Sequence, residues 1–446
     1  MYNPPVKEVT FEELKFINEL GNTETSSSRF FISGMWKASN KNFLENAKSR
    51  DIVKIIQSVQ KTGLIYLADE LFNTKSKHFG LLVEFYLQYI KDQGFNLEDL
   101  DKNVAESTFT LPELALESNG RLISIDFLVR FCICLDTLET ITQQNVNVLD
   151  IGAGLGSMIR VVKLINPSAR CTIIDIPGTL TMSYANLRKS FPDSKFQVVT
   201  TVESISKIDI SADFTFVPAF LASDFEKFSF DIAYNTGSLG EMPQTVAESY
   251  IDLIQKRLNV KQFYSVNRYL EQDNKNLTDE YQATWAVFLD PYWEIQKWEY
   301  QPDLWKFHWI WDAQMAASYL KIHAVRIPKS ELPDELRNKR SEKLFEKAIS
   351  IEPVKGHKWH RCIYESIRYD QRLDNVKSLY EFCKLDNLRE TRFLAKILSN
   401  IDIDTESYEE YLNEMKPGKP GLMYRLRGRI SFEFRRLSNF FNPSDI

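Results

Sequence analysis

A glycine-rich stretch at residues 146–156 constrains the fold of this chain more than any other feature. It reads V-N-V-L-D-I-G-A-G-L-G, an apolar run that reaches Asp150 and then places glycines at 152, 154 and 156. Such a run, followed by alternate glycines, predicts a buried strand that turns tightly into a helix. Residues 171–175, C-T-I-I-D, predict a second strand that ends on Asp175. The result is a strand–helix–strand unit with a carboxylate at the tip of each strand.

The residue types at these tips indicate a ligand site. Glycines leave no Cβ between the loop and a ligand, so a cofactor can lie against the main chain. Asp175 can accept hydrogen bonds from two ribose hydroxyls, because an ionised carboxylate offers only acceptors. A dinucleotide fingerprint reads G-x-G-x-x-G, whereas this loop reads D-x-G-x-G-x-G. Nicotinamide-cofactor binding, and a glycine turn that binds nothing, stay open as alternatives.

The surrounding chain predicts an α/β fold with a Rossmann-like, mostly parallel sheet covered on both faces by helices. Further strands are expected at 230–235, 262–267 and 322–327, and either 195–200 or 214–219 is the third parallel strand. We expect a loop up to Asn119 and Gly120, and a helix over 125–138 capped by Ser124. The expected domains are a helical N-terminal cap at 1–124, the α/β domain at 125–328 with an aromatic-rich insertion at 281–312, a helical region at 329–415 and a basic tail helix at 416–446.

A second motif, N-T-G-S-L-G-E-M at residues 235–242, follows the expected fourth strand. Ligands of open α/β sheets bind beyond the carboxyl ends of the strands, so this loop should face the reacting atoms. Asn235 could hydrogen-bond a cofactor or substrate, and Glu241 could act as general base. The structural alternative is a capping box, because Ser238 and Glu241 have its spacing.

These motifs together resemble a family of sugar O-methyltransferases found in bacterial polysaccharide loci, within the class I S-adenosylmethionine-dependent methyltransferases. The resemblance rests on D-I-G-A-G-L-G, I-I-D-I-P-G-T-L, Y-N-T-G-S-L-G-E-M and F-Y-S-V-N-R, and covers about 125–327. It implies methyl transfer from S-adenosylmethionine to a sugar hydroxyl. The residues expected at the cofactor are Asp150, Gly152, Gly154, Gly156, Asp175, Ile176 and Asn235. Those expected at the acceptor are Ser238, Asn267, Trp305, Trp309 and Asp312.

An aromatic-rich segment supports a carbohydrate acceptor independently. Six of the eight tryptophans fall between 285 and 311, and aromatic faces suit the C–H faces of sugar rings. Packing against the sheet is the alternative for most of them. His308 lies four residues before Asp312 and is the second candidate base after Glu241. No carboxylate cluster has clear ligand spacing, so we expect no metal.

Composition bounds the remaining expectations. A net charge of −6 argues against a general nucleic-acid binder, and five scattered cysteines fit a reducing cytoplasm. The tail has seven basic residues and one acid between 416 and 436, with an apolar helical stripe that continues to 441. Such a helix can bind the inner face of an anionic membrane or a protein partner. A nicotinamide-dependent oxidoreductase and a non-catalytic scaffold in glycan assembly are the alternative functions, and the sequence leaves the oligomeric state open.

Overall fold

The structure is a computed structural model of the 446-residue chain. It describes residues 79–97, 115–118, 121–226, 228–242, 244–269, 289–300 and 318–350, together with 361, 362 and 365. These residues belong to two compact units, the first of which includes all of those up to Glu331. The second begins at Leu332.

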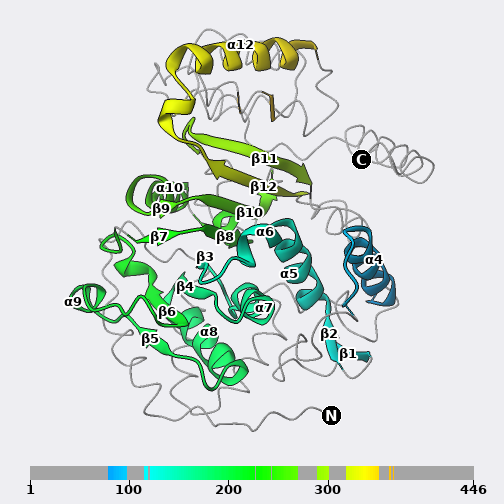
Figure 1. Ribbon diagram of the computed structural model, residues 1–446, viewed down its shortest axis with the longest axis vertical. Coiled ribbons are helices and arrows are strands. Elements are labelled where there is room, and N and C mark those ends of the chain that lie inside the picture. The colour runs from blue at the N-terminus through cyan, green and yellow to red at the C-terminus, as the bar shows by residue number, and fades with distance from the viewer. Residues whose placement is uncertain are drawn as a thin grey trace, which may run out of the picture. The chain divides into compact units, whose positions relative to one another are not determined.

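An eight-stranded sheet organises the first unit, with the strand order β11-β12-β10-β8-β3-β4-β6-β5 (Figure 1). Its strands are β3 (Asn147–Ile151), β4 (Arg170–Asp175), β5 (Phe196–Val198), β6 (Phe214–Pro218), β8 (Ile232–Thr236), β10 (Gln262–Tyr269), β11 (Trp293–Tyr300) and β12 (Ser318–Arg326). All pairings are parallel except those of β12, which runs antiparallel to both β10 and β11. The predicted α/β class with a mostly parallel sheet is confirmed.

The third parallel strand is β6, because it pairs with β4 through the register Cys171↔Phe214. The short β5 lies outside it at the edge of the sheet. Strands β3, β6 and β8 are almost entirely buried, which explains why they read as continuous apolar runs instead of alternating patterns.

Helices α5 (Ile125–Asp136), α7 (Ser157–Ile165) and α8 (Pro177–Ser190) follow one another along the sheet, with contacts between successive helices (Figure 1). Ser124 caps α5 as predicted, since its hydroxyl accepts the N–H of Phe127 at 3.1 Å. Pro177 occupies the first turn of α8, where its missing N–H has no consequence. The other helical elements of this unit are α4 (Phe79–Asp92), α6 (Leu138–Ile141), α9 (Val202–Ile205), η5 (Ala219–Leu221), η6 (Leu239–Glu241), α10 (Gln244–Asp252), η7 (Leu253–Arg257) and η9 (Lys329–Glu331).

Part of the segment expected to be a loop before α5 is a β-hairpin. Strands β1 (Ala115–Ser118) and β2 (Arg121–Ser124) pair antiparallel on either side of Asn119 and Gly120. The prediction of a loop was wrong here, because an Asn-Gly pair between two short strands favours a hairpin turn. A second two-stranded sheet pairs β7 (Ser229–Phe230) with β9 (Asn259–Val260).

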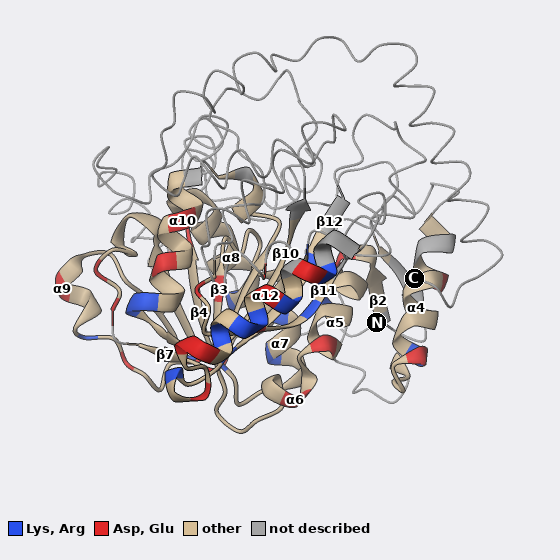
Figure 2. Ribbon diagram, turned by 90° about the horizontal axis from the view of Figure 1, so that it is seen from above, with Lys and Arg blue, Asp and Glu red and all other residues tan. Residues whose placement is uncertain are grey.

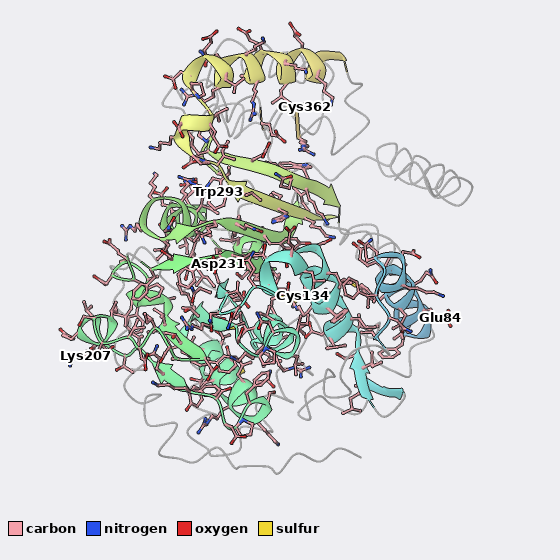
Figure 3. The ribbon with its side chains drawn as sticks, in the orientation of Figure 1. Glu84, Cys134, Lys207, Asp231, Trp293 and Cys362 are labelled. Carbon is pink, nitrogen blue, oxygen red and sulfur yellow. The ribbon has the colours of Figure 1, made fainter. Side chains whose placement is uncertain are left out.

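The expected aromatic insertion at 281–312 contains the strand β11, which belongs to the sheet itself. Trp293, on β11 in Figure 3, and Trp298 are both buried there. These two tryptophans therefore pack in the core, as the alternative reading held. The expected strand at 322–327 is β12, and it lies inside the sheet because β11 pairs with its outer side.

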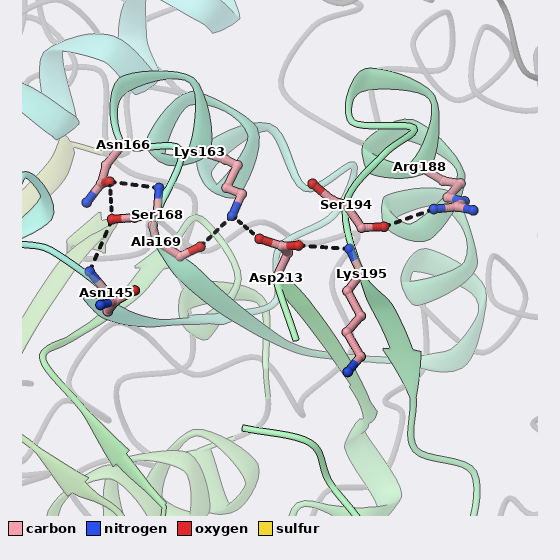
Figure 4. A network of polar contacts seen from close by, with 9 residues as sticks. All are labelled: Asn145, Lys163, Asn166, Ser168, Ala169, Arg188, Ser194, Lys195 and Asp213. Atoms are coloured by element: carbon pink, nitrogen blue, oxygen red, sulfur yellow. Dashed lines mark hydrogen bonds and ion pairs between the residues drawn. The ribbon is translucent and has the colours of Figure 1, made fainter. Parts of the chain in front are cut away.

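A polar network secures the edge of the sheet that holds the amino ends of its parallel strands (Figure 4). The buried Lys163 ammonium at the end of α7 donates to the carbonyl of Ala169 at 2.7 Å and to the carboxylate of Asp213 at 2.5 Å. The other oxygen of Asp213 accepts the N–H of Lys195 at 2.8 Å. One lysine thus joins the segments that enter β4, β5 and β6.

The second unit is described mainly by α12 (Asp334–Ser350), whose basic and acidic positions are coloured blue and red along the ribbon in Figure 2. Arg337 pairs with Asp334 at 2.9 Å within its first turn, and farther along the chain Arg361 pairs with Glu365 at 2.6 Å. This helix lies within the region 329–415 that was expected to be helical. Among the described helices of both units, none combines the length and apolar character that a membrane crossing requires.

Candidate functional site

The glycine loop connects β3 to α7 at the carboxyl edge of the sheet, where the predicted site was placed. Gly152, Gly154 and Gly156 have φ of 70°, 60° and 73°, a left-handed conformation that L-residues rarely adopt. The loop is held to the next strand, since the N–H of Gly152 donates to the carbonyl of Ile174 at 2.8 Å. A Cβ on Gly152 would lie 2.0 Å from the hydroxyl oxygen of Ser238, so the loop also packs closely against the segment that follows β8.

Asp175, at the end of β4, fastens this loop from the other side. One carboxylate oxygen accepts the N–H of Gly154 at 2.8 Å and the other accepts the N–H of Ile176 at 2.7 Å. Burial raises the pKa of Asp175 to about 6, against the opposing effect of its hydrogen bonds from Thr179 and these two amides. The two carboxylate oxygens have about four acceptor sites, and these three donors leave about one of them for a ribose hydroxyl, fewer than the two bonds expected.

Helix α8 completes the support of the loop from beneath. The hydroxyl of Ser183 donates to the carbonyl of Gly154 at 2.8 Å, and the amide of Asn186 donates to the carbonyl of Leu155 at 2.8 Å. A Cβ on Gly156 would meet Leu187 and Ser183 at 3.1–3.3 Å. The loop is therefore held in shape before any ligand binds.

Asp150 differs from every other carboxylate of the site. It is fully buried, and neither of its oxygens has a hydrogen-bond partner among the described residues. Burial raises its pKa to about 7; the charge of Arg130 opposes this shift, while that of Asp175 adds to it. Burying a carboxylate without a hydrogen-bond partner is unfavourable. A ligand that supplied a donor or a positive charge would therefore stabilise Asp150 more than any other group at this edge.

The second predicted motif folds into a braced loop. The side-chain amide of Asn235 donates to the carbonyl of Ile151 at 2.7 Å and to the hydroxyl of Ser238 at 2.6 Å. Its oxygen accepts the N–H of Leu239 at 3.1 Å and the amide of Asn267 at 2.8 Å. Both donors and both acceptor sites of Asn235 are thus occupied, so its amide braces the loop and has no bond left for a cofactor.

Asn267 and Ser238 take part in the same brace. The side-chain oxygen of Asn267 accepts the N–H of Gly240 at 3.0 Å, and its amide also donates to the hydroxyl of Ser265 at 2.7 Å. Ser238 donates to the carbonyl of Ile151 at 3.2 Å and makes no side-chain cap bond to η6. The capping box that its spacing suggested is therefore absent at Ser238.

Arg130 is a charged residue near this edge that the sequence analysis missed. It lies on α5, where its Nε donates to Asp126 at 3.2 Å and an Nη donates to the hydroxyl of Thr236 at 2.7 Å. Both Asp126 and Arg130 are buried. The available signal was an acid and a base four residues apart inside an otherwise apolar helix.

The structure thus brings most of the predicted residues together at one edge. The predicted cofactor residues come from β3, the glycine loop, the end of β4 and the end of β8, and Ser238 and Asn267 lie beside them. The backbone of Glu241 ends η6, directly after the braced loop. His308, Trp305, Trp309 and Asp312 lie outside the described residues. Among the described residues, no three metal-binding side chains gather at one point.

Fold and site together define a Rossmann-like α/β protein with a ligand site at the carboxyl edge of its sheet. No family model matches the sequence, and no curated protein is similar to it. Solved structures that resemble parts of the chain include the magnesium protoporphyrin IX methyltransferase ChlM from Synechocystis PCC 6803 with bound SAH, which is 11% identical, has a TM-score of 0.30 and matches over 56% of this chain and 99% of its own.

Two further solved structures are similar to this chain at the same low level. The N-methyltransferase NodS from Bradyrhizobium japonicum WM9 is 13% identical with a TM-score of 0.28, over 43% of this chain and 94% of its own. A TehB-like SAM-dependent methyltransferase from Corynebacterium glutamicum is 12% identical with a TM-score of 0.27, over 43% and 86%. Similarity at this level does not identify a function, so the proposal below rests on the site.

Proposed function

We propose that this protein is an S-adenosylmethionine-dependent O-methyltransferase that acts on a sugar hydroxyl. The observation that carries the proposal is the buried, unpaired carboxylate of Asp150 at the base of the glycine loop. A carboxylate there suits a cofactor with positive charge, because opposite charges attract strongly where water is excluded. It would repel the pyrophosphate of a dinucleotide, which argues against the nicotinamide alternative.

The sheet order supports the same distinction. In the dinucleotide-binding order a sixth parallel strand lies directly beside the fifth. Here the antiparallel strand β12 occupies that position, between β10 and β11. Within this proposal, Asp175 and the backbone at Ile176 hold the ribose side of the cofactor, the glycine loop lies against it, and Asp150 faces its cationic side.

When bound, the cofactor supplies a methyl group on a sulfonium, which is a strong electrophile. The protein must then hold the acceptor oxygen in line with that methyl group and remove its proton. Glu241 is the first candidate for this base, because η6 places its backbone at the end of the loop that Asn235 and Asn267 brace. His308 is the second candidate. The brace makes the position of η6 independent of bound ligand.

A sugar acceptor is supported by the sequence motifs and by the aromatic residues Trp305 and Trp309. These two residues are in the segment between the end of β11 at Tyr300 and the start of β12 at Ser318, and Tyr300 is the register partner of Leu320. Both strand ends therefore lie at the carboxyl edge that holds the glycine loop. Substrate contacts by Ser238 and Asp312, and binding of a membrane or protein partner by the tail at 416–441, remain part of the proposal.

Calorimetric titration of the full-length protein tests the cofactor. We expect S-adenosylmethionine and S-adenosylhomocysteine to bind and NADH not to bind. Asp150→Asn should weaken S-adenosylmethionine binding by about 10- to 100-fold, the usual effect of losing a charged partner. Asp193→Asn, an exposed acid that follows α8, is the matched control and should bind as the wild type does. Binding of NADH alone would discard the methyltransferase proposal.

The acceptor and the base require a turnover assay. With S-adenosylmethionine and a panel of nucleotide sugars, we expect methylation of a sugar hydroxyl. Glu241→Gln should lower kcat by about 100-fold or more while cofactor affinity is kept, because general-base catalysis contributes about 10²–10⁴. If that variant turns over like the wild type, Glu241 is not the base, and His308→Gln becomes the variant to measure.

A further inference from the structure

Arg130 and Asp126 form a buried charged pair that has no role in the site as described so far. They are the acid and the base of the apolar sequence I-D-F-L-V-R-F-C-I-C-L in α5, and their residues are 6% and 7% exposed. Burying two charges is unfavourable unless specific partners compensate for the lost water. The pair therefore lowers the free energy of unfolding relative to apolar residues, which could pack this helix alone.

The register of the sheet shows which group this pair faces. Asp150 on β3 is the register partner of Tyr234 on β8, so both side chains point to the same face. Thr236 lies two residues farther along β8 and shares that face. The helix α5 covers this face, since the hydroxyls of Thr137 at its end and Tyr234 lie 2.5 Å apart. The guanidinium of Arg130, bonded to Thr236, is therefore on the face of the sheet that carries Asp150, and its charge acts on that carboxyl.

The other titratable groups around Asp150 do not keep it ionised. Asp175 on β4 is a like charge that favours the protonated acid. Burial raises the pKa of Tyr234 far above its usual range and that of Cys171 to about 12, so both stay neutral. Arg130 is the cation that lowers the pKa of Asp150. The charge of Asp150 thus depends on the balance between Arg130 and the acids around it.

We propose, on the basis of the proposed function, that Arg130 is a positioning residue of the methyl-donor site: anchored by Asp126 and Thr236, it keeps Asp150 in the charged form that binds a cationic cofactor. A neutral Asp150 would offer no charge to the cofactor. Asp126 and Thr236 hold the guanidinium in place, so the effect of Arg130 on Asp150 depends on both anchors.

The test is the affinity for S-adenosylmethionine as a function of pH, measured by titration of the full-length protein between pH 5.5 and 9. In the wild type we expect affinity to fall as Asp150 takes up a proton, with a midpoint near pH 7. Arg130→Met should move this midpoint to higher pH by about one unit or more, the usual effect of a near opposite charge. Arg130→Lys, which keeps the positive charge, should keep the midpoint near the wild-type value.

Two controls separate a charge effect from a folding defect. Far-ultraviolet circular dichroism and S-adenosylhomocysteine binding at pH 9, where the carboxylate is most fully ionised, should stay close to wild type in folded variants. Thr236→Val, which removes an anchor of Arg130 and no charge, should move the midpoint in the same direction as Arg130→Met but by less. A structural lesion would lower affinity at every pH and leave the midpoint in place.

The outcomes also separate this inference from the proposed function. If the wild type binds neither methionine derivative at any pH, the methyltransferase proposal fails and the inference fails with it. If the wild type binds and Arg130→Met keeps the wild-type midpoint, only the role of Arg130 is refuted. A midpoint that moves to higher pH in Arg130→Met and stays in place in Arg130→Lys establishes it.

Discussion

Substitution of Gly152 by alanine tests the closest contact of the candidate site. The new Cβ would lie 2.0 Å from the hydroxyl oxygen and 2.4 Å from the Cβ of Ser238. Relieving such an overlap costs about 1–3 kcal/mol. The φ of 70° adds about 1–2 kcal/mol for a residue with a Cβ. We therefore expect Gly152→Ala to lower the free energy of unfolding by about 2–5 kcal/mol.

A double-mutant cycle identifies the contact itself. Ser238→Ala keeps the Cβ at 2.4 Å and should not rescue Gly152→Ala, whereas Ser238→Gly removes both overlapping atoms. The cycle of Gly152→Ala with Ser238→Gly should show a favourable coupling of about 1–3 kcal/mol, which leaves mainly the conformational term. Ser238→Gly alone should cost about 1–2 kcal/mol, since Asn235 and Ile151 lose a partner.

Urea unfolding followed by far-ultraviolet circular dichroism gives the four midpoints. Calorimetric titration of S-adenosylhomocysteine on the same proteins reports whether the loop keeps its shape at the ligand site. The reasoning would be refuted if the two substitutions were additive, or if Ser238→Ala rescued Gly152→Ala as well as Ser238→Gly does. Additivity would mean that the two loops do not touch, and equal rescue by Ser238→Ala would mean that only the hydroxyl oxygen of Ser238 obstructs the new Cβ.

Three further substitutions test other parts of the structure. Without cofactor, Asp150→Asn should raise the free energy of unfolding above pH 7 by up to about 4 kcal/mol, because the folded wild-type carboxyl has a pKa of about 7 and the unfolded one has the usual value of 3.8. The difference between this variant and the wild type should vanish in urea titrations near pH 4. Asn235→Ala should cost about 2–4 kcal/mol in the same assay, since it leaves buried partners unpaired. Lys163→Met should cost about 1–3 kcal/mol through the loss of its bonds to Asp213 and Ala169, and an unchanged midpoint would contradict the network in Figure 4.

The elements that sequence predicted best carry local signals. Ser124 marks the start of α5 and Pro177 that of α8, because each satisfies or removes a helix-terminal N–H within one turn. The glycine loop and the two acidic strand ends were also predicted, since backbone conformation at a tight turn restricts residue type directly.

Other features could not be predicted because they depend on pairing between distant segments. The choice of β6 over β5 as neighbour of β4, and the position of β12 between β10 and β11, are decided by register across the whole sheet. Asn235 was expected to bind the cofactor, yet its side-chain amide is hydrogen-bonded to Ile151, Leu239 and Asn267. The hydrogen-bond partners of a side chain cannot be identified from the residues next to it in the sequence.

By itself, the sequence determined that this is an α/β protein with a strand–glycine loop–helix unit and acids at two strand tips, because hydrophobic period and glycine placement act over a few residues. Only the tertiary structure decided that Asp150 is buried without a hydrogen-bond partner among the described residues, and that the charge of Arg130 on α5 acts on it. The physical reason is that burial and electrostatic fields are sums over segments far apart in the chain. Residue type shows which groups can be charged, and the fold decides which of them are.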